Sequence, residues 1–317
     1  MTDWYMGFDL GGMSAKAGLF DQKGQCLYKC TAATSKDDGY VTVVTKLYQL
    51  AKETLAAAGA SLERLKGVGL ASPGVIDGNG GVVIRWSNYG WTDKPIGRDF
   101  AQRLSAPVRL VNDANAAALG EAKFGASKKY TDSVFLTLGT GVGSGIISGG
   151  KLMENCGGAE AGHMVIEAGG VPCPCGRRGC FEQYASATAL IRDTKKAMFE
   201  HKDSVMWELV DGDPDKVDGR TAFSAAKADD PAGEKVVKNY ISYLGEGIAN
   251  LVNLLRPQAV IIGGGICNEG EYLLQPLRRW VGERIYVDGE TIPLVIARAK
   301  LGNDAGIYGA AALAMGR

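Results

Sequence analysis

Residues 133–151 read SVFLTLGTGVGSGIISGGK, in which two apolar runs flank a glycine-rich loop and a Gly-Gly-Lys turn follows. The runs Ser133–Leu138 and Ile146–Ser148 predict strands, because they are short, apolar and bounded by turn residues. The same order opens the chain, with Trp4–Leu10, then Gly11-Gly12, a second strand and another glycine-containing turn. A repeat about 130 residues apart predicts two similar halves, each with a glycine-rich hairpin.

These hairpin loops offer backbone N–H groups to an anion. Glycine has no Cβ, so Gly11-Gly12 and the loop 139–145 leave bare amides within reach of a phosphate. A third glycine run, Gly263-Gly264-Gly265, follows the predicted strand Ala259–Ile262, and a flat adenine or ribose could lie against it. Each loop alone is also an ordinary turn. Together they favour a phosphate chain gripped from both sides, although none matches a Walker loop or a dinucleotide fingerprint.

A polar pair, Asn112-Asp113, stands between the predicted strand Val108–Val111 and an alanine-rich helix. Asn and Asp are the favoured residues at a helix N-cap, so capping alone would explain the pair. Open α/β sheets also bind ligands at the carboxyl ends of their strands, where Asp113 could accept a proton. The sequence leaves both interpretations open.

Residues 163–180 hold one of the two histidines and three of the seven cysteines of the chain. These four candidate ligands are His163, Cys173, Cys175 and Cys180. One imidazole and three thiols form a set that closes tetrahedrally on Zn²⁺ in structural sites. Incidental thiols or a disulfide are the alternatives, and the turn-forming glycines between the ligands favour the metal. Glu160 and Glu182 flank the cluster, so the metal would hold these carboxylates near each other.

The composition excludes several functional classes. Lys plus Arg and Asp plus Glu both number 35, whereas an electrostatic nucleic-acid binder carries a basic excess. No apolar run is long enough to cross a membrane, and the N-terminal residues lack the features of a signal peptide. We therefore expect a cytoplasmic protein with no nucleic-acid or membrane partner.

Five motifs occur in order across nearly the whole chain, and together they resemble the ROK family of repressors, open reading frames and sugar kinases, within the actin and hexokinase superfamily. The motifs are Asp9-x-Gly11-Gly12, Asn112-Asp113-Ala114-Asn115, residues 137–145, Glu160-x-Gly162-His163 and Cys173-x-Cys175-Gly176-x-x-Gly179-Cys180. The resemblance implies an α/β protein of the two-domain actin-like ATPase (ribonuclease H-like) type, with a cleft between the domains. Residues 1–112 and about 302–317 would form a small domain, which the helix Ala305–Ala314 joins. Residues 113–301 would form a large domain that contains the zinc-binding segment 163–180.

The resemblance also implies an activity, the ATP-dependent phosphorylation of a hexose at its 6-hydroxyl, with glucose and glycolysis as the first expectation. Asp113 matches the general base of the family. The residues that match sugar-binding positions are Gly74, Asn112, Asp113, Glu160, His163 and Glu182. Those that match nucleotide-binding positions are Asp9, Gly11, Gly12, Ser14, Lys16, Gly139, Thr140, Gly141, Gly143, Gly263, Gly264 and Gly265. The expected cofactors are ATP with Mg²⁺ and a structural Zn²⁺ bound by His163 and the three cysteines, and no residue identifies itself as a dedicated magnesium ligand.

The resemblance leaves alternatives and one departure. The sugar could instead be N-acetylmannosamine, N-acetylglucosamine, fructose, mannose or allose. A sugar-sensing transcriptional regulator is a further alternative, which the short segment before Asp9 disfavours because the family's repressors carry a DNA-binding domain there. Relatives lead us to expect a homodimer or homotetramer. Met13 stands where the family usually has Thr, so Ser14 or the backbone would have to replace a hydroxyl contact to phosphate.

Overall fold

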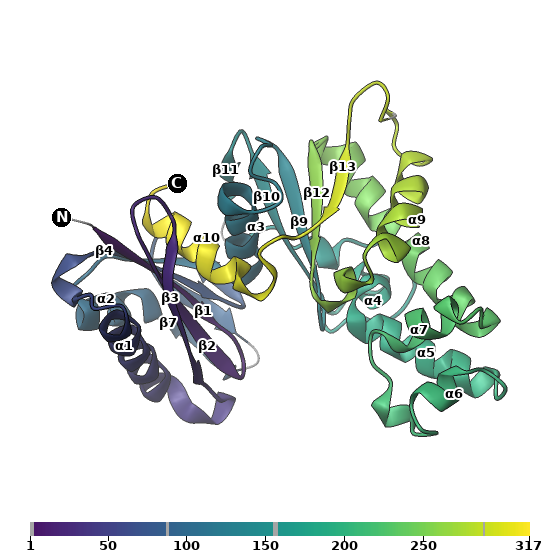
Figure 1. The fold of residues 1–317 in the computed structure, drawn as a ribbon, viewed down its shortest axis with the longest axis horizontal. Coiled ribbons are helices and arrows are strands. Elements are labelled where there is room, and N and C mark those ends of the chain that lie inside the picture. The colour runs from purple at the N-terminus through teal and green to yellow at the C-terminus, as the bar shows by residue number, and fades with distance from the viewer. Residues whose placement is uncertain (1–2, 87–88, 155–157, 288) are drawn as a thin grey trace. The chain divides into compact units, whose positions relative to one another are not determined.

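The computed structural model describes residues 3–86, 89–154, 158–287 and 289–317. The chain divides into two compact units (Figure 1). The first unit comprises Met1–Phe135, Gly145–Ala159 and Lys300–Arg317, and the second comprises Leu136–Ser144 and Glu160–Ala299. These bounds differ from the domains expected from the sequence, because residues 113–135 and 145–159 pack with the first unit.

A five-stranded mixed sheet forms the centre of the first unit, in the order β3-β2-β1-β4-β8. Its strands are β1 (Trp4–Leu10), β2 (Ser14–Phe20), β3 (Cys26–Ala33), β4 (Leu65–Ser72) and β8 (Val108–Asn112). β2 runs antiparallel to β1 and β3, whereas β1, β4 and β8 are parallel to one another. The carboxyl ends of these three parallel strands therefore meet at one edge of the sheet, which is where open α/β sheets place their ligands.

Helices cover the sheet of the first unit. The helices α1 (Gly39–Ala57) and α2 (Ile96–Leu104) contribute Leu47 and Phe100 to one large hydrophobic core. The helix α10 (Ala305–Ala314) packs on β1, β4 and α3 (Asp113–Phe124) (Figure 1).

Glycines explain how closely α10 approaches its neighbours. A Cβ at Gly69 of β4 would overlap the carbonyl oxygen of Ala310, and one at Gly309 would overlap that of Ala116. Backbone thus lies directly against backbone at these two positions. The helix predicted at Ala305–Ala314 is confirmed.

A small antiparallel sheet, β5-β6-β7, adjoins the first unit's core. Its strands are β5 (Val75–Asp77), β6 (Val82–Trp86) and β7 (Trp91–Lys94). The rings of Trp86, Tyr89 and Trp91 pack together here, with centroid distances of 4.1 Å for Trp86–Tyr89 and 4.8 Å for Tyr89–Trp91.

The other five-stranded sheet has the order β11-β10-β9-β12-β13. Its strands are β9 (Ser133–Leu138), β10 (Val142–Ser148), β11 (Lys151–Leu152), β12 (Ala259–Gly263) and β13 (Val295–Arg298). One expectation was wrong, since β10 begins at Val142 rather than Ile146, which leaves only 139–141 as a turn. The glycine at 145 has a packing reason, because a Cβ there would lie 2.5 Å from the Cβ of Ala118 on α3.

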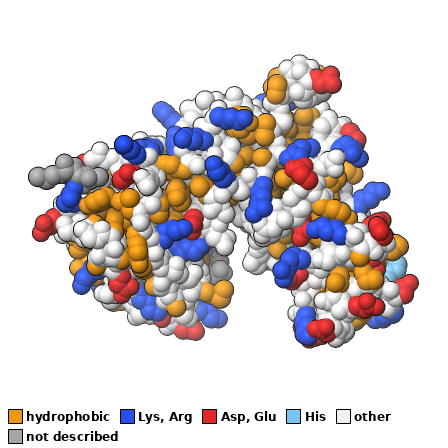
Figure 2. All heavy atoms as spheres, in the orientation of Figure 1, with side chains coloured by type: hydrophobic (Ala, Val, Ile, Leu, Met, Phe, Trp, Pro, Cys, Tyr) orange, Lys and Arg blue, Asp and Glu red, His pale blue; other side chains and the backbone are white. Residues whose placement is uncertain are grey.

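Of this sheet, residues 136–138 and 142–144 and the strands β12 and β13 belong to the second unit, which also contains helices. Its helices are α4 (Glu182–Ala185), α5 (Ala187–Glu200), α6 (Met206–Leu209), α7 (Thr221–Lys227), α8 (Pro231–Leu255) and α9 (Glu271–Gly282). No helix of the described residues is long and apolar enough to cross a membrane. Figure 2 shows acidic and basic side chains interspersed on the face that it draws, in keeping with the balanced charge.

Candidate functional site

The turn between β1 and β2 presents free backbone donors. The Gly11 amide donates to the carbonyl of Ser14 at 2.8 Å, which closes the turn. Among the described residues, the amides of Gly12 and Met13 have no protein acceptor. A Cβ on Gly12 would meet nothing within 4 Å, and the Met13 side chain is 86% exposed. The turn therefore offers consecutive N–H groups to an anion that approaches from outside.

Asp9 and Lys16 lie opposite each other at the base of this turn. The pKa of Asp9 is raised to about 6, chiefly by burial and then by the negative charge of Asp113, while Lys16 acts in the opposite sense. The Lys16 ammonium donates to the carbonyl of Asn303 at 2.7 Å. Asp9 also lies against Gly306 at the start of α10, where a Cβ would come within 2.5 Å of its carboxylate oxygen.

Asn112 and Asp113 divide two tasks between them. Asn112 is the N-cap of α3, and its Oδ1 accepts from the amides of Ala114 at 2.9 Å and Asn115 at 3.2 Å. Asp113 is the first residue of the helix, and burial raises its pKa despite an opposing hydrogen bond from the Ala114 amide. Asn112 therefore forms the cap, and the hydrogen bond from the Ala114 amide at 2.9 Å does not offset the effect of burial on the pKa of Asp113.

Gly74 adjoins the same sheet edge as Asn112. The Asn112 Nδ2 donates to the carbonyl of Gly74 at 3.2 Å, which ties the loop after β4 to the end of β8. Gly74 has a φ of 97°, and a Cβ there would overlap the carbonyl oxygen of Arg85. Only glycine therefore fits this position. The first unit thus gathers Asp9, the turn 11–14, Gly74, Asn112 and Asp113 at the carboxyl ends of its parallel strands.

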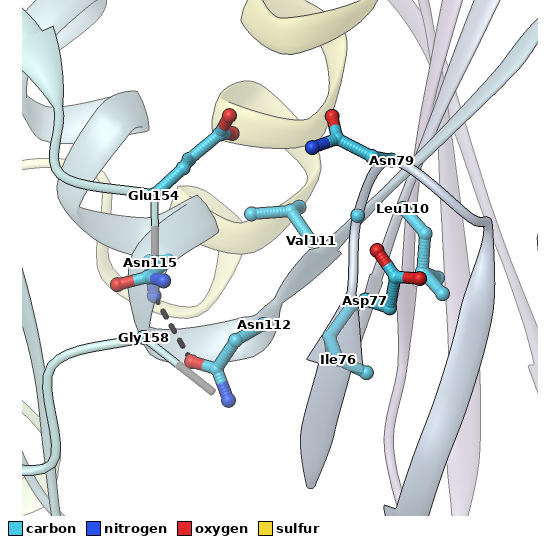
Figure 3. A pocket seen from close by; sticks show the side chains of 10 residues that line it. Ile76, Asp77, Asn79, Leu110, Val111, Asn112, Asn115, Glu154 and Gly158 are labelled. Atoms are coloured by element: carbon cyan, nitrogen blue, oxygen red, sulfur yellow. Dashed lines mark hydrogen bonds between the residues drawn. The ribbon is translucent and has the colours of Figure 1, made fainter. Parts of the chain in front are cut away.

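A cavity of about 130 Å³ opens beside Asn112 (Figure 3). Its polar lining includes carboxylates and amides but no lysine or arginine: Asp77, Asn79, Asn112, Asn115 and Glu154. Sequence reasoning missed all of these except Asn112. Asn115 was within reach because it belongs to the quoted Asn-Asp-Ala-Asn motif, whereas Asp77, Asn79 and Glu154 carry no motif signal.

The second unit holds the other glycine turn. The Gly139 amide donates to the carbonyl of Gly141 at 3.0 Å, and the Gly139 carbonyl accepts from the Ala187 amide at 2.8 Å. A Cβ on Gly141 would lie 2.6 Å from Glu182 Oε2, so the glycine makes room for that carboxylate. Thr140 is exposed at the tip, whereas Gly143 lies within β10 rather than in the turn.

The predicted ligand set is assembled in this unit. One donor atom from each of His163, Cys173, Cys175 and Cys180 lies within 4.8 Å of all the others. His163 Nδ1 and Cys173 Sγ are 3.6 Å apart, as are the sulfurs of Cys175 and Cys180. Tetrahedral Zn²⁺ with bonds of about 2.0–2.3 Å separates its ligands by distances of this size. The donor set and its spacing thus fit zinc.

The carboxylate of Glu182 connects this cluster to the glycine turn. Its Oε1 accepts from the Cys173 thiol at 3.2 Å and lies 3.8 Å from His163 Nδ1, while its Oε2 lies beside Gly141. Glu160 precedes the short helix Ala161–His163, whose first amide donates to Ser144 Oγ at 3.0 Å. In the second unit Glu182 therefore lies against the turn 139–141 with His163 beside it, while Glu160 is exposed at the start of the short helix.

The third glycine run follows β12 in the second unit. Gly264 has a φ of 90°, and a Cβ there would overlap the carbonyl oxygen of Leu138 at the end of β9. Gly263 ends β12, and Gly265 begins a short 3₁₀ helix with open space around its α-carbon. Close packing therefore explains Gly264, while Gly265 leaves a bare surface.

The ROK family model matches residues 5–317. The chain belongs to the ROK family. It is 37% identical to a glucokinase of Halalkalibacterium halodurans, with 98% of this chain and 94% of the relative covered. It is 36% identical to a glucokinase of Thermotoga maritima, with 97% and 96% covered.

Solved structures of ROK proteins share the fold. A ROK family glucokinase from Streptomyces griseus, in complex with glucose and AMPPNP, superposes with a TM-score of 0.83 at 33% identity and covers 99% of this chain and 100% of its own. The predicted family and actin-like α/β fold class are thereby confirmed.

Proposed function

We propose that this ROK protein transfers the γ-phosphate of ATP to the 6-hydroxyl of a hexose, and that its substrate is glucose. The observation that carries the proposal is Asp113, a carboxylate at the carboxyl end of β8 whose pKa is raised by burial, while the adjacent Asn112 forms the helix cap. The relatives of this chain in Halalkalibacterium halodurans and Thermotoga maritima are glucokinases. The structure of the Streptomyces griseus relative contains glucose and the ATP analogue AMPPNP.

Asp113 is the general base of the proposed reaction. The 6-hydroxyl oxygen attacks the γ-phosphorus, the bond from that phosphorus to the β–γ bridging oxygen breaks, and ADP leaves. The hydroxyl proton passes to the Asp113 carboxylate. General-base catalysis of this kind contributes roughly 10²–10⁴-fold to the rate. The residues proposed to contact the hexose are Gly74 and Asn112 of the first unit and Glu160, His163 and Glu182 of the second. Their carboxylates, amide and imidazole suit the several donors and acceptors of a sugar.

Two glycine turns receive the nucleotide in this proposal. The free amides of Gly12 and Met13 bind phosphate, with Ser14 and Lys16 nearby, and the turn Gly139–Gly141 with Thr140 serves the phosphates from the second unit. Gly143, inside β10, supports that turn. Residues 263–265 bind the adenosine in this proposal, and the space next to the α-carbon of Gly265 is open for it.

The two metals have different places in the proposal. Mg²⁺ enters with ATP and neutralises phosphate charge, and Asp9 would hold it, because that carboxylate lies at the base of the phosphate turn beside the like charge of Asp113. Zn²⁺ would be bound by His163, Cys173, Cys175 and Cys180. It would fix the orientation of His163 and the position of Glu182.

The variant Asp113→Asn tests the proposal. It keeps the size of the side chain but removes the proton acceptor, so kcat should fall at least about a hundredfold while glucose affinity changes much less. A coupled ADP assay gives kcat, and calorimetric titration gives the glucose Kd. Its melting temperature should not fall, because the carboxylate that it replaces is buried at a cost. Near-normal turnover would return Asp113 to a structural role.

A further inference from the structure

Two residues outside the turn between β1 and β2, Thr34 and Tyr89, donate hydrogen bonds to its backbone carbonyls. Thr34 Oγ1 donates to the carbonyl of Gly11 at 3.3 Å, and the Thr34 amide donates to the carbonyl of Met13 at 3.1 Å. The Tyr89 hydroxyl lies 3.4 Å from the carbonyl oxygens of both Gly11 and Gly12, so its single proton is shared between them. Every carbonyl of residues 11–13 thus accepts a hydrogen bond from Thr34 or Tyr89.

Because a peptide unit is planar, a hydrogen bond that fixes the direction of a carbonyl also fixes the direction of the next amide. In a trans peptide unit, the C=O of one residue and the N–H of the next point in opposite directions. A hydrogen bond to the Gly11 carbonyl therefore turns the Gly12 amide outward, and one to the Gly12 carbonyl turns the Met13 amide outward. These are the amides without a protein acceptor among the described residues.

Tyr89 is fixed well enough to impose a direction. Its side chain packs against Trp86 and Trp91, and the residue is only 8% exposed. In the described part of the chain, its hydroxyl has hydrogen bonds to the two turn carbonyls alone. A buried hydroxyl left without a hydrogen-bond partner costs free energy. The Tyr89 side chain and the turn between β1 and β2 therefore stabilise each other's position.

We infer that Tyr89 is a positioning residue of the nucleotide site, and that it aims the amides of Gly12 and Met13 at a phosphate of ATP. Thr34 shares this task through the carbonyls of Gly11 and Met13. The inference rests on the proposed function, since it takes the turn as the phosphate site. It also explains how a turn with the exposed, non-polar Met13 keeps its donors oriented: the contacts come from the carbonyl side and need no hydroxyl at position 13.

The test compares Tyr89→Phe with Tyr40→Phe. Tyr40 belongs to the same aromatic group, with its ring 5.3 Å from that of Trp91, and its hydroxyl donates to Asp99 at 2.6 Å, away from the turn. Each variant loses one tyrosine hydroxyl, but only Tyr89→Phe removes hydrogen bonds to the turn, those to the carbonyls of Gly11 and Gly12. Calorimetric titration with ATP and with adenosine, and the KM values for ATP and glucose, are measured for both variants and the wild type.

Tyr89→Phe should weaken ATP binding about three- to tenfold, as expected for one lost hydrogen bond, and leave adenosine binding and the glucose KM unchanged. Tyr40→Phe should bind ATP as the wild type does. Equal ATP affinity in Tyr89→Phe and the wild type, or a parallel loss for adenosine, would overturn the role of Tyr89 alone. A wild-type chain that binds no ATP would overturn the proposed function as well. If Tyr89→Phe fails to fold, Thr34→Val must show the same ATP-selective loss.

Discussion

Asn112 and Asp113 are adjacent residues of similar chemistry in different surroundings. Sequence could not separate a helix cap from a catalytic carboxylate, because both residues are favoured at an N-cap. The structure separates them through hydrogen bonds that depend on backbone conformation, since Asn112 has extended φ and ψ while Asp113 has entered the helix. Such a division depends on where a helix begins to within one residue, which sequence patterns do not resolve.

The pKa of Asp9 leads to a pH prediction. Its folded-state pKa of about 6 lies above the ordinary value of 3.8, so the folded protein binds this proton more tightly than the unfolded chain does. The contribution of Asp9 to stability is therefore favourable below pH 3.8 and is lost as the pH rises through about 6. Asp9→Asn should raise the melting temperature at pH 8 more than at pH 5.

Thermal denaturation of both proteins at pH 5 and pH 8 without magnesium checks this expectation. In the wild type, kcat/KM for ATP should also fall below about pH 6, where Asp9 becomes protonated and can no longer hold a cation. A difference in melting temperature between variant and wild type that does not change with pH would show that Asp9 ionises normally.

The strands were largely predictable from apolar runs, and the last helix was expected from the family resemblance. The strands at Trp4–Leu10 and Ser133–Leu138 and the helix at Ala305–Ala314 agree with the structure. The start of β10 was not predictable, because Gly143 and Gly145 look like loop residues in sequence. Gly145 is required instead by the approach of α3, a contact between segments far apart in the chain.

The packing of α10 leads to a prediction about stability. A Cβ at Gly309 would overlap the carbonyl oxygen of Ala116, and backbone cannot move aside as a flexible side chain can. Gly309→Ala should therefore destabilise the fold by more than about 2 kcal/mol. Gly282→Ala, at the end of α9, is the matched control, since a Cβ there meets nothing within 4 Å. Urea denaturation curves measure both, and equal midpoints would refute the close contact between α10 and α3.

The cluster of His163 and three cysteines was predicted from spacing alone, because short loops keep these candidate ligands together. Purified protein should contain about one zinc per chain. Cys175→Ser should lower the metal content and the melting temperature, and it should raise the sugar KM more than the ATP KM, since His163 and Glu182 lie at the cluster. Cys30→Ser, on β3 of the first unit, is the control. Elemental analysis and steady-state kinetics measure these effects, and metal-free wild-type protein with full turnover would disprove the zinc site.

At the scale of the molecule, the ordered motifs predicted the family and the fold class, and both are confirmed. The boundary between the two units was harder to predict from the sequence. Residues 113–135 follow the site motif in sequence but pack with the first unit, and only tertiary contacts reveal this. The cavity residues Asp77, Asn79 and Glu154 escaped notice because no motif marks them. The homodimer or homotetramer expected from relatives stays a prediction.

The most direct test of the proposed function is the turnover of the wild-type chain with ATP and Mg²⁺ over a panel of hexoses and N-acetylhexosamines. ADP release is followed by a coupled assay, and the sugar product is identified by mass spectrometry. We predict one glucose 6-phosphate for each ADP, with a higher kcat/KM for glucose than for mannose, fructose, allose, N-acetylglucosamine or N-acetylmannosamine. A higher kcat/KM for one of the others would change the substrate but keep the kinase. Absence of ADP release with every sugar would contradict the account.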